Sequence, residues 1–130
     1  MILAIKTDKP EATLSLLGEK GEVLATEEWL AHRQLSDTIL TKIDELLASG
    51  DVNLQDLRGV VVFKGPGSFT GLRLGVTVAN TLAYSLRVPV VGVEGADWQA
   101  NGCKSLAAGK DDRIVLPVYG GGANITLPRK

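Results

Sequence analysis

The stretch from Gly65 to Arg73, with the sequence GPGSFTGLR, combines residue types that can bind an anion. It lies where an apolar β-branched run gives way to a helical pattern, and the free backbone amides of a helix start attract negative charge. The same residues also fit a plain turn, in which Ser68 or Thr70 caps the helix without any ligand. The Lys of the phosphate-loop pattern is absent, so both interpretations stay open. The candidate anion or nucleotide contacts are Gly65, Gly67, Ser68, Thr70 and Arg73.

The helix predicted after this stretch, over residues 70–86, carries small residues at a regular spacing of four. Residues four apart lie on one helical face, so this face is nearly bare of side chains. Such a face admits a partner helix at close range, and it fits equally well against the chain's own sheet. If a partner covers it, the candidate contacts on this helix are Gly71, Leu72, Gly75, Val76, Ala79 and Ala83.

The elements before the glycine-rich stretch are predicted from the period of their apolar residues. Residues 2–7, 13–17 and 22–30 are short apolar segments separated by residues typical of hairpin turns, so they predict an antiparallel meander of three strands. From Leu35 the apolar residues recur at intervals of three and four, which predicts an amphipathic helix that ends at Gly50.

Two further strands, over residues 60–63 and 88–93, flank the second helix. Right-handed crossovers place both strands parallel to the first one, so the sheet is mixed, with five strands in the order 3-2-1-4-5. This α/β arrangement is the ribonuclease H-like half-domain found in the actin-like ATPase superfamily. Fold alone assigns no function.

The C-terminal part of the chain carries weaker patterns. Residues 98–113 indicate a short helix and a loop, and residues 114–119 and 123–127 indicate two strands that form a hairpin around Gly120–Gly122. The length of 130 residues fits one domain, 1–130.

Composition excludes several classes of protein. Fourteen Lys and Arg against fifteen Asp and Glu leave a net charge of −1, which argues against a domain that binds nucleic acid on its own. The single cysteine, Cys103, and the single histidine, His32, exclude an internal disulfide and a Cys/His zinc site. The apolar start breaks at Lys6, which is too short for a signal sequence or a membrane span, so a cytoplasmic protein without membrane contact is expected.

The eleven residues GPGSFTGLRLG, 65–75, resemble the signature of the bacterial TsaB family, also called YeaZ, the non-catalytic dimerisation subunit in the synthesis of tRNA threonylcarbamoyladenosine. Further similar segments are the first strand at 2–5, the hairpin at 21–25, the first long helix at 40–47 and the strand at 88–93. The resemblance therefore covers a ribonuclease H-like lobe over residues 1–95.

The resemblance implies a scaffold rather than an enzyme. Family members pair with the transferase TsaD and the small ATPase TsaE, which together place threonylcarbamoyl on the adenosine beside the anticodon. ATP and Mg²⁺ are then used by the complex, no cofactor is expected in the isolated chain, and tRNA is met only through the complex. The first two helices form the dimer surface in the family, which adds Leu40 and Leu47 to the candidate partner contacts and makes a homodimer possible.

Three features depart from the family pattern. Members usually carry Asp-Thr after the first strand, where the Asp serves the nucleotide and metal site, but this chain has Lys6-Thr7. A His-Ser pair often opens the first helix, and here the pair is Leu35-Ser36. Typical members also continue into a second lobe, of which residues 96–130 resemble a truncated remnant.

A rival interpretation is an enzyme, a small ATPase or kinase-like lobe that uses residues 65–73 as its phosphate cradle. Lys6 in the metal position argues against it, because a magnesium-bound nucleotide prefers a carboxylate there.

Overall fold

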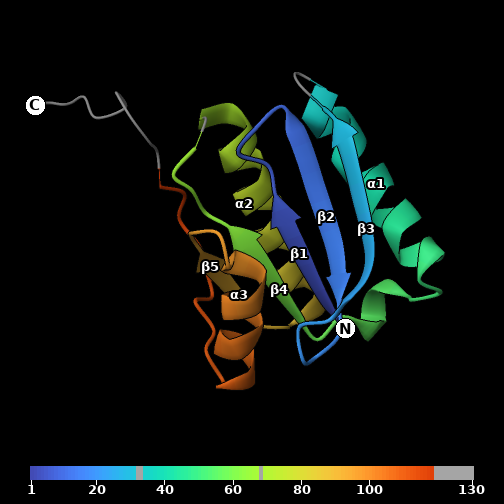
Figure 1. Cartoon of the computed structure of the whole chain (residues 1–130), viewed down its shortest axis with the longest axis vertical. Coiled ribbons are helices and arrows are strands. Elements are labelled where there is room, and N and C mark those ends of the chain that lie inside the picture. Colours follow the sequence, from blue (N-terminus) through green and yellow to red (C-terminus); the bar gives the residue numbers. More distant parts are fainter. Residues whose placement is uncertain (32–33, 68, 119–130) are drawn as a thin grey trace, which may run out of the picture.

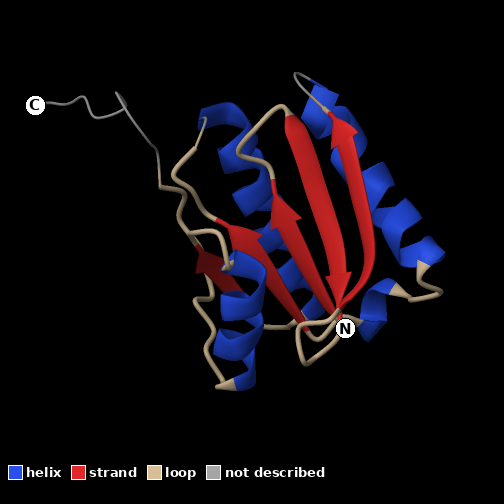
Figure 2. Cartoon of the chain, viewed as in Figure 1, coloured by secondary structure: helices blue, strands red, loops and turns tan. Residues whose placement is uncertain are grey.

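The structure is a computed structural model, and it describes residues 1–31, 34–67 and 69–118. The order of elements along these residues is the predicted one, with three strands, a helix, a strand, a helix and a fifth strand, followed by a short third helix. Figure 1 shows the sheet between two helical layers, and Figure 2 shows the same view by type of element.

The five strands form one mixed sheet in the order β3-β2-β1-β4-β5, which confirms the predicted strand order. The first three are antiparallel neighbours, whereas β4 is parallel to β1 and β5 is parallel to β4. Their bounds are β1 (Ile2–Lys6), β2 (Glu11–Leu17), β3 (Val23–Leu30), β4 (Gly59–Phe63) and β5 (Val90–Val93).

Two long helices cover one face of the sheet and a shorter helix covers part of the other face (Figure 1). Their bounds are α1 (Leu35–Ser49), α2 (Phe69–Leu86) and α3 (Trp98–Ala107), and a 3₁₀ turn, η2 (Leu54–Asp56), follows α1. The predicted amphipathic helix is confirmed in α1, whose apolar residues at intervals of three and four are buried against β2 and β3.

The core follows the alternation of side chains along each strand. On β1, Leu3 and Ile5 belong to the cluster under α1 and α2, whereas Ile2 and Ala4 belong to the cluster under α3. The central strand β4 is covered on both faces, and Val60, Val61 and Val62 are fully buried. The continuous β-branched run is therefore explained by its position between two layers.

The C-terminal region begins with α3, which confirms the short helix expected after residue 98. Residues 111–118 then run as a loop beside β5 (Figure 2). The prediction of a first hairpin strand over residues 114–119 is wrong for residues 114–118, which form a bend and loop held by side chains. The glycine turn and the second predicted strand lie in residues 119–130, outside the described residues, so that part stays a prediction.

Candidate functional site

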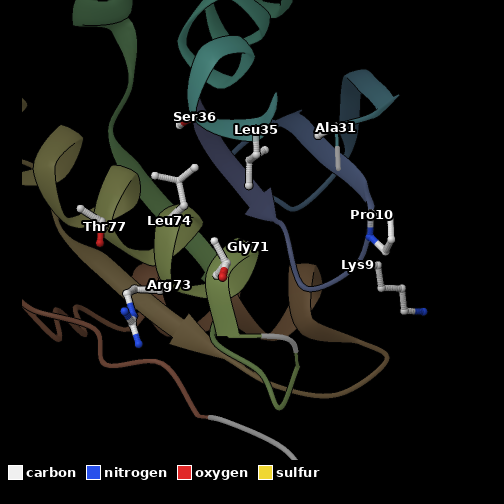
Figure 3. A pocket seen from close by; sticks show the side chains of 10 residues that line it. Lys9, Pro10, Ala31, Leu35, Ser36, Gly71, Arg73, Leu74 and Thr77 are labelled. Carbon is white, nitrogen blue, oxygen red and sulfur yellow. The ribbon is translucent and has the colours of Figure 1, made fainter. Parts of the chain in front are cut away.

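A groove of about 580 Å³ lies between α1, α2 and the turn that joins β1 to β2. Figure 3 shows that α1 contributes Leu35 and Ser36, and that α2 contributes Leu74 and Thr77. The full lining consists of Lys9, Pro10, Ala31, Leu35, Ser36, Thr70, Gly71, Arg73, Leu74 and Thr77. The lining is mostly apolar, so the groove suits an apolar side chain of another polypeptide better than a small polar ligand.

Helix α2 builds one side of this groove because its residues divide between two faces. Leu72, Val76 and Ala79 point into the protein and are at most 2% exposed. Arg73 and Thr77 are exposed, and Leu74 is half-buried beside the core. Since a helix turns by about 100° per residue, neighbouring positions in the sequence end up on different sides.

The stripe of small residues on α2 packs against the chain's own sheet and not against a partner. A Cβ atom on Gly75 would overlap the hydroxyl group of Thr7, which follows β1, and this hydroxyl donates a 2.7 Å hydrogen bond to the carbonyl of Gly71. Ala79 and Ala83 are buried in the core cluster below. The prediction that this face admits a partner helix is therefore wrong, and the alternative of sheet packing is correct.

The same burial corrects three further predicted partner contacts, because Leu47, Leu72 and Val76 are at most 5% exposed within the chain. Two predicted contacts remain accessible. Leu40 on α1 is 60% exposed, and Gly71 lines the groove.

Most of the groove was not predicted from the sequence, because only Thr70, Gly71 and Arg73 of its lining were candidate contacts. The residues missed are those of the β1–β2 turn, Lys9 and Pro10, together with Ala31, Leu35, Ser36, Leu74 and Thr77. Nothing in the local pattern links this turn to a helix 60 residues later, because sequence periodicity reports only on neighbours along the chain.

At the first two glycines of the glycine-rich stretch, other residues of the same chain lie where a side chain would otherwise be. Gly65 has a φ of 120°, and a Cβ there would overlap the carbonyl oxygen of Val118. A Cβ on Gly67 would overlap the side chain of Asp8. Close backbone approach thus explains both glycines without a ligand.

The predicted anion contacts are consequently separated. Gly65 and Gly67 pack on Val118 and Asp8, whereas Thr70 and Arg73 line the groove, and Ser68 lies outside the described residues. The structure does not gather the four described contacts into one cradle.

Lys6, at the carboxyl end of β1, also contacts other residues of its own chain. Its ammonium group lies 2.6 Å from the Asp8 carboxylate and 4.7 Å from the centre of the Phe63 ring. The cation is thus paired with an anion and rests on an aromatic face. Lys6 stands at the position where the family pattern has the Asp of the nucleotide site.

Within the described residues, the structure favours neither a metal site nor a reactive thiol. Within residues 1–31, 34–67 and 69–118, no three His, Cys, Asp or Glu side chains gather where they could hold a metal ion. Cys103 is buried, and this burial raises the pKa of its thiol, with a further rise from the carboxylate of Glu22. The thiol is therefore held in its less reactive, neutral form. None of the helices described is long and apolar enough to cross a membrane.

The fold and the groove define a ribonuclease H-like α/β lobe with an apolar surface between its first two long helices. The model of the family "tRNA N6-adenosine threonylcarbamoyltransferase", TsaD, matches residues 28–128. The chain belongs to this family, in its TsaB/YeaZ branch.

Relatives and a solved structure support this placement. The chain is 40% identical to the tRNA threonylcarbamoyladenosine biosynthesis protein TsaB of Bacillus subtilis over 91% of its own length and 49% of the relative. It is 33% identical to TsaB of Escherichia coli over 87% of its length and 51% of that protein. YeaZ from Pseudomonas aeruginosa superposes with a TM-score of 0.65 at 29% identity, covering 72% of this chain and 43% of YeaZ. The chain thus spans about half the length of the curated relatives it matches.

Proposed function

We propose that the chain is a non-catalytic subunit in the biosynthesis of tRNA threonylcarbamoyladenosine and that it binds a TsaD-type threonylcarbamoyltransferase. Two similarities support this proposal. The TsaB relatives are named for this biosynthesis, and the family model that matches residues 28–128 is that of the transferase itself. Related lobes with the same fold can pair through equivalent helices, because their surfaces share one geometry.

The groove between α1 and α2 is the observation that carries the proposal. A concave and mostly apolar groove between two helices has a shape that can receive a side chain from the helix of another protein. The half-buried Leu74 and the buried Leu35 and Ala31 supply its apolar wall. The partner's helix would place an apolar side chain between α1 and α2.

The non-catalytic role is supported by the end of β1. Lys6 and Asp8 neutralise each other there, and the first two glycines of the glycine-rich stretch are packed by the chain itself. A nucleotide phosphate would have to displace both contacts. ATP and Mg²⁺ are accordingly used by other members of the complex, which include a TsaE-type ATPase.

The same proposal implies where the chain acts and how it meets tRNA. It acts in the cytoplasm, where tRNA is modified, and it meets tRNA through the complex, since its own net charge is −1. In the absence of the transferase, the groove is available for a homodimer of the chain.

The proposal is tested by mixing the purified chain with a TsaD-type transferase from the same organism and measuring sedimentation of both. A stable complex that raises threonylcarbamoyl transfer to tRNA is expected, together with no ATP turnover by the chain alone. Failure to form a complex, or ATP turnover by the chain that is lost on changing Thr70 to Ala, would refute the role as a non-catalytic subunit.

A further inference from the structure

Residues 111–118, here called the strap, cover the edge of β5 that does not pair with β4 (Figure 1). The Asp111 carboxylate accepts a 3.1 Å hydrogen bond from the Val90 amide, and the Asp112 carboxylate accepts a 2.8 Å bond from the Gly92 amide. The Asp112 amide in turn donates to the Val90 carbonyl over 2.8 Å. Two neighbouring carboxylates thus satisfy backbone donors that an edge strand would otherwise expose.

The middle of the strap is held by the side chain of Asn80 on α2. Its amide nitrogen donates to the Val115 carbonyl over 3.0 Å, and its amide oxygen accepts from the Val115 amide over 2.8 Å. This pair of bonds satisfies both backbone groups of one residue, as a strand neighbour would. Asn80 can make both bonds only if the backbone at Val115 is extended, so that its N–H and C=O groups face the same side.

The side chain of Val115 fills a notch in β5. Val115 is 3% exposed, and a Cβ atom on Gly92 would overlap its methyl group. The flanking residues Ile114 and Leu116 are 69% and 73% exposed. The notch therefore selects one residue of the strap by size, because a glycine at position 92 leaves room for a small branched side chain only.

The strap follows α3 through a turn in which the amides of Gly109 and Lys110 donate to the carbonyls of Leu106 and Ser105. After α3 the chain passes Gly109, which has a φ of 87° and no neighbour within 4 Å of the place that a Cβ atom would take. The strap itself contacts α2, β5 and the Lys64 carbonyl, to which the Val118 amide donates over 2.7 Å. An exchange of straps between two copies would break the hydrogen bonds of this turn and form the contacts of the strap again on the other copy.

We propose that the cleft formed by Asn80, Gly92 and the free edge of β5 is a binding site for a segment of the pattern Asp-Asp-x-x-Val that bends at its third and fourth residues, as the strap does at Arg113, which has a φ of 65°. The strap of the same chain fills the cleft here, and the strap of a second copy is the alternative occupant. The second copy is the occupant because its strap carries this sequence and needs no new contact. The chain's own strap competes with that of the second copy for the cleft, and it does so at a high effective concentration because both are in one chain. Exchange between copies therefore requires that the chain's own strap first leaves the cleft.

Two complementary variants test the exchange. Val115→Asp spoils the strap and leaves the cleft intact, whereas Gly92→Val fills the notch and leaves the strap sequence intact. Each variant carries a donor or an acceptor dye at its N-terminus, and energy transfer is measured in mixtures. The proposal expects Val115→Asp with Gly92→Val to associate at least tenfold more tightly than Val115→Asp with itself, a comparison that cancels any pairing through α1 and α2. Equal association of both mixtures, with both variants folded by circular dichroism, would overturn it.

A peptide of residues 110–118 gives a second readout that does not depend on dimers. It should bind the Val115→Asp chain at least tenfold more tightly than the unchanged chain, in fluorescence anisotropy, and the same peptide with Val115→Asp should not bind. Should Val115→Asp fail to fold, Asp112→Ala loosens the strap at a surface position, and the peptide should then bind about threefold more tightly than to the unchanged chain. Binding that is equal for the loosened and the unchanged chain would refute the site.

Discussion

The two sides of α2 differ in what they contact, although both carry residues that favour close packing. The side toward the sheet presents Gly75, Ala79 and Ala83 to β1 and β4 and is closed to partners. The side toward α1 presents Leu74 and Thr77 to an open groove. Small residues at a spacing of four therefore show where a helix packs closely, but not whether it packs on its own sheet or on another protein.

The largest effect is expected on the closed side. Gly75→Leu should lower the free energy of unfolding by about 3 kcal/mol, because its side chain must displace Thr7 from the core. The control is Thr77→Leu on the open side, which should change the stability by less than about 0.5 kcal/mol. Urea unfolding of both variants measures the difference. Equal stabilities would show that α2 does not pack on the sheet through Gly75.

A smaller loss is expected from the hydrogen bond that joins β1 to α2. Thr7→Val removes the donor to the Gly71 carbonyl and keeps the shape of the side chain, so the stability should fall by about 1 kcal/mol. Thr13→Val serves as the control, because the hydroxyl of Thr13 makes a long 3.4 Å contact with the exposed Glu28 carboxylate, and it should lose less. A larger loss for the control would contradict the role given to Thr7.

The smallest change in stability belongs to α1. Leu40 is 60% exposed, so Leu40→Ser should alter the stability by less than about 0.5 kcal/mol. If α1 meets the transferase outside the groove as well, this variant should weaken binding about threefold, as peripheral contacts commonly do. Calorimetric titration with the transferase decides whether the interface extends to Leu40. An unchanged affinity would confine it to the groove.

Much of the fold could be predicted from the sequence because its signals are local. The β-branched run at Val60–Val62, the period of α1 and the turn residues of the meander each depend on neighbours along the chain. The strand order then follows from the handedness of crossovers.

The groove and the strap could not be predicted in this way, because their contacts join residues far apart in the sequence. Ala31 and Leu74 line the same groove, and Asp111 binds the edge of β5 through a side chain that is typical of a turn. The small-residue stripe was ambiguous for a physical reason. Sheet packing and helix packing both require that two backbones approach closely, and they are distinguished by contacts with distant residues, such as that of Gly75 with Thr7.

Two threonines on α2 decide whether the open side of this helix binds the transferase. Thr77 lines the groove, whereas Thr81 is exposed one turn further along and is not part of the lining. Titration of a TsaD-type transferase into the chain with Thr77→Trp should give a Kd at least tenfold higher than that of the unchanged chain, about 1.4 kcal/mol, because the ring fills the groove. Thr81→Trp should stay within about twofold of the unchanged chain. An unchanged Kd for Thr77→Trp, or an equal loss for Thr81→Trp, would show that the transferase binds elsewhere.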